Sequence, residues 1–304
     1  MFVETGARRM NNPEDRLIKL ASTLFGKVLH GYLKLPGKYL GGCPNEYPFN
    51  EEDARTDVCY VVILRNVPQY INIEDESSRV NKNTLSKIIK YSTNIECIKR
   101  TNVISVITTT EPLDKCLKEL NISETKILKP IIISFPEFDG DEKLKAIRKR
   151  IDNDELFSEE EAIEIIFLLR MFKKNQPEIL EEVCKLFTRL KVEDPDFKER
   201  MKFCMQCIIH KYAKTVEDIE QLEKVIKLTI TYEDYIEKQR EEGIKEGIEK
   251  GIERGIERGV KEGIERGKLQ LAQIIAKTDG IQKAIELSGF TKEEIETGKL
   301  QPSK

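Results

Sequence analysis

The sequence predicts a mixed α/β core, an all-helical region after it, and a long C-terminal helix that carries a glycine repeat. Three observations predict this fold class. Short apolar, β-branched runs bounded by turn signals occupy the first part of the 304-residue chain, as is typical of strands. Beyond Pro136 the apolar positions recur at helical spacing. From Gly243 to Gly267, glycine occupies every fourth position.

The composition is that of a folded chain of two or so domains, because 39% of the residues are hydrophobic. We expect four segments. The core occupies residues 1–140, a helical domain 141–235, the repeat helix 236–268, and a short helical segment 269–304.

Charge does not mark the whole chain as a nucleic-acid binder. Its 51 Lys and Arg residues nearly balance its 54 Asp and Glu residues, which leaves a formal net charge of -3. Any DNA surface must therefore be local. The best local candidate is a basic helix face, although such a face is usually only solvated. It consists of Lys143, Lys145, Arg148, Lys149 and Arg150.

We expect a cytoplasmic protein without membrane contact. The chain shows no signal-peptide pattern near its start and no apolar run approaching the roughly 20 residues of a membrane span. Its seven cysteines, odd in number and scattered, favour reduced thiols. Cys204, Cys207 and His210 share a helical pattern and are interpreted as buried helix positions rather than as zinc ligands.

The first helix is predicted to begin at Asn12 and Pro13, because leucines follow at helical spacing. Pro36 and Gly37 end it. A short strand is expected at residues 38–40, with an irregular region through Asp53.

A β-hairpin is predicted next. Asp57 opens the apolar run 58–64, a turn follows at residues 66–68, and a second strand occupies residues 70–76. We expect the two strands to fold about a midpoint at residues 66–67.

In that register Asp57 lies opposite Glu76, and Glu74 lies opposite Cys59. Side chains alternate along a strand, so Asp57, Glu74 and Glu76 share one face, while the other face carries Ile71, Ile73 and Asp75. Three carboxylates this close repel one another unless a proton or a cation intervenes, and hard oxygen ligands suit Mg²⁺. The alternative is that these acids are ordinary strand-end residues in contact with solvent.

The remaining elements follow in order. Asn83 is predicted to cap a helix that ends at Lys99. Strands are expected at residues 103–109 and 130–135. Ser158 and Glu161 form a capping-box pattern before a helix. Further helices are expected at residues 162–172, 177–190, 196–212 and 216–228.

This order of elements, with Asp57 opening an apolar strand and residues 73–78 closing the next, resembles the PD-(D/E)xK nuclease superfamily. More narrowly, it resembles the recombination-promoting nuclease and putative transposase family. The second strand of that family typically reads Ile-Glu-x-Gln-Ser, and its tail often carries Gly-Ile-Glu-Lys repeats. The resemblance covers residues 10–140 and the tail beyond residue 240, and implies a restriction-endonuclease-like α/β core.

The resemblance implies that Asp57 and Glu74 are metal ligands of a Mg²⁺-dependent DNA endonuclease, in which an activated water attacks the phosphodiester. Glu76 stands where the family has Lys or Gln, and a carboxylate cannot supply positive charge. Glu76 is then an extra ligand or a base, or the site is inactive. Otherwise the basic role has moved to the next helix, where the candidates are Lys82, Lys87 and Lys90.

The glycine repeat predicts a long helix with a winding Gly-Ile stripe, because a period of four residues exceeds the 3.6-residue turn by about 40°. Each interior glycine costs a helix about 1 kcal/mol relative to alanine. A homo-oligomer formed as a coiled coil through this helix is one expectation, and a frayed solvated helix is the other. Residues 281–291 resemble half a helix-turn-helix, without base-reading side chains.

The leading expectation is therefore Mg²⁺-dependent DNA endonuclease chemistry. The alternative is a catalytically degenerate nuclease-fold protein that acts as a DNA-binding or self-associating module. In a third reading the tail is the functional part and the core is its scaffold.

Overall fold

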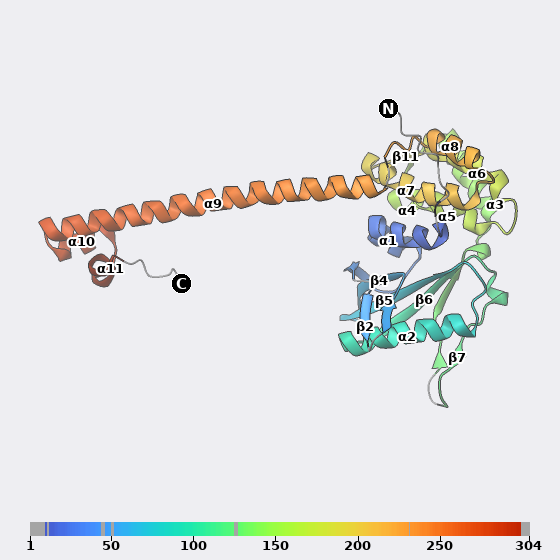
Figure 1. Cartoon of the computed structure of the whole chain (residues 1–304), viewed down its shortest axis with the longest axis horizontal. Coiled ribbons are helices and arrows are strands. Elements are labelled where there is room, and N and C mark those ends of the chain that lie inside the picture. The colour runs from blue at the N-terminus through green and yellow to red at the C-terminus, as the bar shows by residue number, and fades with distance from the viewer. Residues whose placement is uncertain are drawn as a thin grey trace. The chain divides into compact units, whose positions relative to one another are not determined.

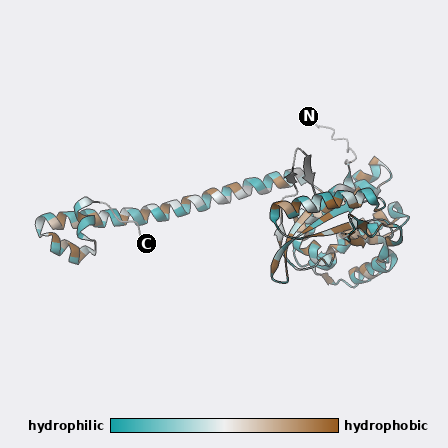
Figure 2. Ribbon diagram, turned by 90° about the horizontal axis from the view of Figure 1, so that it is seen from below, coloured by the Kyte–Doolittle hydropathy of each residue, from teal (hydrophilic) through white to brown (hydrophobic). Residues whose placement is uncertain are grey.

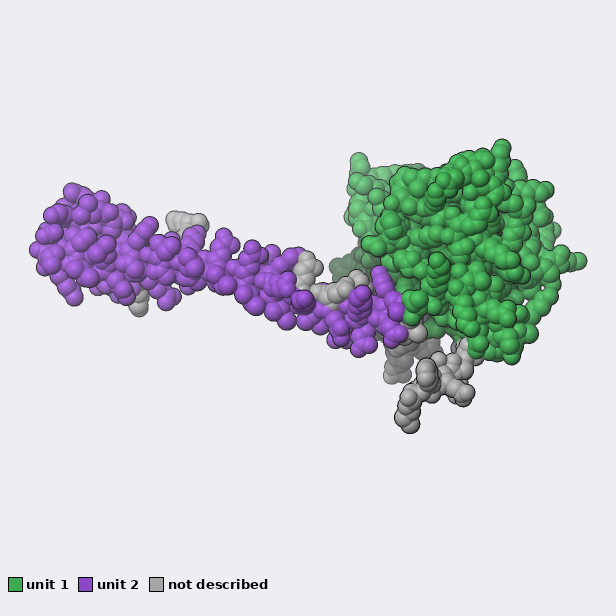
Figure 3. Space-filling model, turned by 90° about the horizontal axis from the view of Figure 1, so that it is seen from above, with its two compact units in different colours: residues 1–229 green, residues 230–304 purple. Residues whose placement is uncertain are grey.

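The computed structural model describes residues 10, 12–43, 46–49, 52–124, 127–230 and 232–298. The chain divides into two compact units, residues 1–229 and 230–304 (Figure 3). The first unit contains a mixed five-stranded sheet with flanking helices and the helical region, and the second contains the long C-terminal helix. The predicted mixed sheet followed by helices is confirmed. The four segment boundaries stay a prediction.

The central sheet has the order β1-β4-β5-β6-β9. β1 pairs with β4 and β4 with β5 in antiparallel fashion, whereas β5–β6 and β6–β9 are parallel. Helices α1 and α2 cover opposite faces of this sheet (Figure 1). The bounds are α1 (Pro13–Tyr32), β1 (Lys38–Gly42), β4 (Val58–Leu64), β5 (Val67–Glu76), α2 (Lys82–Lys99), β6 (Val103–Thr109) and β9 (Ile131–Ser134).

The register of the β4–β5 hairpin differs from the predicted one. Val58 pairs with Ile73, whereas the predicted register would pair it with Asp75, so the partner of each β4 residue lies two positions earlier on β5. The turn consists of Arg65 and Asn66, whose φ angles of 53° and 64° are both left-handed. A two-residue turn with two positive φ angles matches the twist of a hairpin. Because the error is an even number of residues, the predicted faces of β5 are unchanged, with Glu74 and Glu76 on one face and Ile71, Ile73 and Asp75 on the other. Asp57 precedes β4 and pairs with Lys19 of α1, so the prediction that Asp57 shares the face of Glu74 is not confirmed.

Each face of the sheet has its own core. Ile71 and Ile73 of β5 lie in the large core that also contains residues of α1 and of the helical region. On the other face, Leu85 and Ile88 of α2 pack with Ile107 of β6. Because apolar side chains are buried on both faces, the residues of β5 cannot change faces, and this determines which face each polar residue of β5 occupies.

Two local predictions are wrong. The N-cap of α2 is Asn81, whose side chain accepts hydrogen bonds from the N–H groups of Asn83 and Thr84. Asn83 was expected in that role. The region predicted to be irregular contains an antiparallel pair, β2 (Glu46–Phe49) and β3 (Glu52–Arg55).

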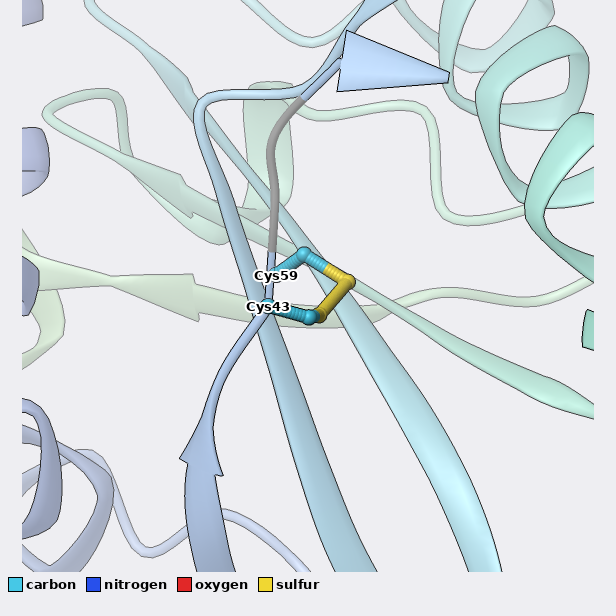
Figure 4. Close-up of a disulfide and its surroundings, with 2 residues drawn as sticks. All are labelled: Cys43 and Cys59. Carbon is cyan, nitrogen blue, oxygen red and sulfur yellow. A yellow bond between two sulfur atoms is a disulfide. The ribbon is translucent and has the colours of Figure 1, made fainter.

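A disulfide joins Cys43 and Cys59 (Figure 4). It corrects the expectation that all thiols are reduced. Cys43 follows β1, and its backbone N–H donates to the carbonyl of Cys59, 2.9 Å away, so the β1–β4 pairing brings the two sulfur atoms together. The other five cysteines are free, and Cys204 and Cys207 are buried in α7 as predicted.

The helical region packs on the α1 face of the sheet. The capping box of Ser158 and Glu161 is present, but the helix predicted at residues 162–172 is broken into three short pieces. These are α4 (Glu159–Ala162), α5 (Glu164–Phe167) and η3 (Leu168–Met171). The other helices of the region are α3 (Gly140–Asp152), α6 (Gln176–Arg189), α7 (Pro195–Tyr212) and α8 (Val216–Val225).

Short elements complete the first unit. The pair β7 (Leu120–Asn121) and β8 (Ile127–Leu128) is antiparallel, and β10 (Leu156–Phe157) and β11 (Lys191–Val192) are parallel. Two further 3-10 turns are η1 (Leu113–Lys115) and η2 (Phe135–Glu137).

The second unit is built on α9 (Tyr232–Thr278), a helix of 47 residues. Helices α10 (Ile281–Ser288) and α11 (Lys292–Thr297) pack on its C-terminal part around Leu269, Ala272, Ala284 and Ile295. Apolar residues recur along the repeat part of α9 between polar ones (Figure 2). They are exposed: Ile244, Ile248, Ile252, Ile256, Val260 and Ile264. None of the described helices has an apolar stretch of the length needed to cross a bilayer.

Candidate functional site

Two buried carboxylates come together where β4 begins and β5 nears its end. Asp57 directly precedes β4, and continuing the Val58–Ile73 pair places it opposite Glu74. Asp57 is 6% exposed and Glu74 is 3% exposed. Two carboxylates removed from water in this way need compensating cations or protons.

Asp57 is compensated from the α1 side of the sheet. Lys19 Nζ lies 3.1 Å from Asp57 Oδ1. The backbone N–H of Asp75 donates to Asp57 Oδ2 at 2.9 Å. This hydrogen bond ties the start of β4 to β5 and fixes the direction of the Asp57 carboxylate. Lys19 was not expected in the site.

Glu74 is compensated from the opposite layer. Lys87 Nζ on α2 lies 2.8 Å from Glu74 Oε2. Both oxygens of the Glu74 carboxylate are buried, and the Asp57 backbone N–H also donates to this carboxylate. Burial, followed by the charge of Asp57, raises the pKa of Glu74 to about 7, and the ammonium of Lys87 opposes this rise. Glu74 therefore changes charge close to neutral pH.

Of the three lysines suggested by the sequence, Lys87 is the one placed against the acid pair. Lys82 and Lys90 are exposed on α2. Lys87 also lies over the ring of Tyr91, with its Nζ 5.5 Å from the ring centroid. The tyrosine ring and the Glu74 carboxylate together orient the ammonium.

Glu76 has contacts of its own at the start of α2. Its Oε1 accepts hydrogen bonds from the N–H (3.2 Å) and the Oγ (2.7 Å) of Ser78. Its Oε2 accepts from Thr84 Oγ1 at 3.2 Å. Glu76 thus anchors the loop that leads into α2, a role that its place in the sequence motif did not indicate.

A second acid of β5, Asp75, forms a buried ion pair that the sequence did not reveal. Its Oδ1 lies 2.7 Å from Arg170 Nη2, and the two side chains are 1% and 2% exposed. Thr108 Oγ1 donates to the same oxygen. Burial raises the pKa of Asp75, and Arg170 and Thr108 oppose the rise. The sequence signal was Arg170 itself, a single charge inside the apolar run 165–171.

The donor set fits one hard divalent cation. The described residues contain no group of three or more His, Cys, Asp or Glu side chains arranged to hold a metal ion. Asp57 and Glu74 supply two carboxylates, and Mg²⁺ is commonly bound through one or two carboxylates with water completing its shell. The mutual repulsion of the two buried acids would be relieved by such a cation.

In comparisons with known proteins, no family model, no curated protein and no solved structure matches this chain. The chemistry of the site therefore follows from its own residues. Two buried acids, one directly before β4 and one on β5, are each paired with a lysine from a different helix and form a charge-balanced site.

Proposed function

We propose that this protein is a Mg²⁺-dependent DNA endonuclease of the recombination-promoting, transposase-associated kind, with a restriction-endonuclease-like core. The observation that supports the proposal most strongly is the meeting of Asp57, Glu74 and Lys87. These three residues come from the start of β4, from β5 and from α2. An acid pair can hold a metal ion that acts as a Lewis acid, and an adjacent ammonium can stabilise the negative charge that develops on the phosphate.

The order of elements supports the same proposal. An N-terminal helix precedes an antiparallel β1-β4-β5 meander, and α2 then connects β5 to the parallel strand β6. This is the arrangement that the resemblance implied. Because the acids lie on the two central antiparallel strands, the sheet holds them in fixed relative positions.

Each residue has a defined part in the proposal. Asp57 and Glu74 would hold Mg²⁺, which when bound would supply a Lewis acid for the phosphodiester. The Asp75 N–H keeps the Asp57 carboxylate oriented. Lys87 would leave Glu74 and place its positive charge near the phosphate. Lys87 would thereby take the role of the family's motif Lys, whose place Glu76 occupies in this chain.

The test is nicking of supercoiled plasmid DNA in Mg²⁺ by the purified chain, by Asp57→Asn and by Glu74→Gln. Each substitution removes one charge with little change in volume. We expect each to reduce nicking by about 100-fold or more, the scale of losing one electrostatic stabiliser of a transition state. Wild type should lose all nicking in EDTA.

The matched control is Asp152→Asn, which removes an exposed carboxylate on α3. It should nick like wild type, and circular dichroism should show the same helix content for all three variants. Unchanged activity in both Asp57→Asn and Glu74→Gln would exclude this site.

One observation favours the alternative, a degenerate DNA-binding or self-associating protein. Both acids are already paired with lysines, and Glu76 is held by Ser78 and Thr84. A nuclease fold that had lost its metal would be stabilised in this way. DNA binding without Mg²⁺-dependent cleavage of supercoiled, linear or single-stranded DNA would establish the alternative.

A further inference from the structure

A basic cleft of about 530 Å³ lies in the first unit, outside the acid pair. Its lining includes five cationic side chains and one carboxylate, that of Glu111. The cations come from η1, from the η3 region and from the end of α7, and are Lys115, Arg170, Lys173, Lys174 and Lys211. Arg170 pairs with Asp75, and Lys115 Nζ lies 3.9 Å from the Glu111 carboxylate, so the net positive charge of the cleft depends chiefly on Lys173 and Lys174.

The cleft is next to the candidate site along the strands. Ser77 and Thr110 line it, and they directly follow the ends of β5 and β6. Ser77 is three residues beyond Glu74, a distance of about 10 Å at the rise of an extended strand. The carboxyl ends of parallel strands are a common place for ligands to bind.

Lys173 and Lys174, which follow η3, are exposed cations of the cleft. No ion pair joins either of them to another described residue. The basic face of α3 differs in this respect. Lys143 lies 2.9 Å from Glu164, Arg150 lies 2.9 Å from Glu161, and Arg148 pairs with Glu182. That face is largely neutralised by the protein itself.

We propose that this cleft binds the sugar-phosphate backbone of DNA and thereby sets the position of the strand relative to Asp57 and Glu74. The proposal rests on the proposed function for its choice of ligand. Lysine ammonium groups bind phosphates as point charges without reading bases, so the contacts position the strand and carry no sequence preference. Hydroxyl groups of Ser77 and Thr110 add neutral donors suited to the same oxygens.

The helical region contributes to the site in this arrangement. Arg170 lines the cleft and also pairs with Asp75, the residue whose N–H orients Asp57. A DNA strand bound in the cleft would therefore contact Arg170, which is linked through Asp75 to Asp57 of the acid pair. This gives the otherwise unexplained helices a part in substrate binding.

The test is fluorescence anisotropy of a short fluorescein-labelled DNA duplex with the full chain in EDTA, where cleavage cannot occur. We expect Lys173→Ala/Lys174→Ala to weaken binding by at least about tenfold near 0.1 M salt. The slope of log K against log salt should fall by about two, one for each phosphate contact removed. Lys173→Arg/Lys174→Arg keeps both positive charges and should have the affinity and the salt slope of the wild type.

The matched control is Lys145→Ala/Lys149→Ala, which removes two exposed lysines from the α3 face. It should change the affinity by less than about twofold. If the control loses affinity and the cleft variant does not, the α3 face is the DNA surface and the proposal is wrong. Absence of any wild-type binding at low salt also overturns it.

The two proposals fail separately. A chain that binds DNA through Lys173 and Lys174 but never nicks it would refute only the nuclease proposal. A chain whose nicking depends on Asp57 and Glu74, with an affinity insensitive to the cleft lysines, would refute only the cleft. Loss of binding to an acidic peptide as well as to DNA would show a nonspecific polyanion surface and would also refute the cleft.

Discussion

Three acids stand close together in the site, and each has a cation from a different part of the fold. Asp57 pairs with Lys19, Glu74 with Lys87, and Asp75 with Arg170. Arg170 and Asp75 are fully buried, whereas about half of the Lys87 side chain is exposed. An ammonium that is half in water can move at small cost, and a buried guanidinium cannot. Of the two lysines, Lys19 is 39% exposed and Lys87 is 49% exposed, so under the proposed function Lys87 is the cation expected to leave its carboxylate most easily when a metal ion binds.

The pH dependence of cleavage should follow Glu74. Its pKa of about 7 means that the carboxylate needed for Mg²⁺ forms as the pH rises through neutrality, so activity at subsaturating Mg²⁺ should rise there. Lys87→Met removes a charge that lowers this pKa, so the midpoint of the pH–rate profile should move to higher pH. Lys90→Met is the comparison on the same helix and should move it less. If the midpoint in Lys87→Met equals that of the wild type, Lys87 does not influence the group whose titration controls cleavage.

Substitutions at Glu76 distinguish an anchoring role from a metal ligand. Gln keeps an oxygen that can accept from Ser78 or Thr84, so Glu76→Gln should retain turnover with the same Mg²⁺ dependence. Glu76→Lys restores the positive charge of the motif and should raise turnover if the phosphate passes nearby. A nicking assay titrated with Mg²⁺ measures both. If both variants instead need a higher Mg²⁺ concentration for half-maximal nicking, their Mg²⁺ binding is weaker and Glu76 is a third ligand.

Sequence reasoning predicted the acids better than their partners. Asp57 and Glu74 were found because they belong to a local motif with a strand period of two. Lys19 and Arg170 lie 38 and 95 residues from their partners in the chain, and such pairing depends on packing of α1 and η3 against the sheet. No local pattern contains that information.

Among the elements, the strands and helices were predicted more accurately than their ends. The strand at residues 103–109 agrees with β6, and the helix at residues 196–212 agrees with α7 to within one residue. The hairpin turn was misplaced because Arg65 and Asn66 adopt positive φ, which is unusual for Arg and gives no sequence signal. Asn83 was predicted as the N-cap of α2 instead of Asn81. Both residues are asparagine, which suits an N-cap, so residue type does not distinguish the two positions.

The repeat helix α9 presents a row of exposed apolar residues, and Ile256 is 62% exposed. Added Cβ atoms at the repeat glycines would meet nothing within 4 Å, so the glycines are not required by packing within the chain. Without side chains, these glycines leave room for a second helix to approach the backbone closely. Rows spaced four residues apart interdigitate when two helices cross at about -50°, a geometry in which the Ile row of one copy fits against the glycines of the other.

Self-association through this row is therefore expected. Sedimentation equilibrium of the full chain should show concentration-dependent oligomers. Ile248→Asn/Ile256→Asn should weaken association by more than about tenfold, because burying one Ile side chain contributes about 1.5–3 kcal/mol. The control is Leu287→Asn, since Leu287 on α10 is also exposed, at 67%, but lies outside the row. A chain that stays monomeric at every concentration would contradict this expectation.

At the scale of the whole first unit, one hydrophobic core extends from α1 and the sheet into the helices that follow. Phe135 at the end of β9 stacks on Phe167 of α5, with ring centroids 5.3 Å apart, and Arg170 lies over Phe135. The sequence showed that both parts contain apolar faces but not that the faces meet. This packing places Arg170 of η3 against Asp75, the neighbour of Glu74 on β5.

The central claim is that Asp57 and Glu74 hold a divalent cation, and anomalous diffraction from crystals soaked in Mn²⁺, a Mg²⁺ substitute, tests it most directly. We predict one peak about 2.0–2.5 Å from carboxylate oxygens of both residues, with Lys87 Nζ withdrawn from Glu74. Crystals of Glu74→Gln should lack the peak. At saturating Mn²⁺, a peak only at other sites, or a Lys87 Nζ still 2.8 Å from Glu74 Oε2, would contradict the claim.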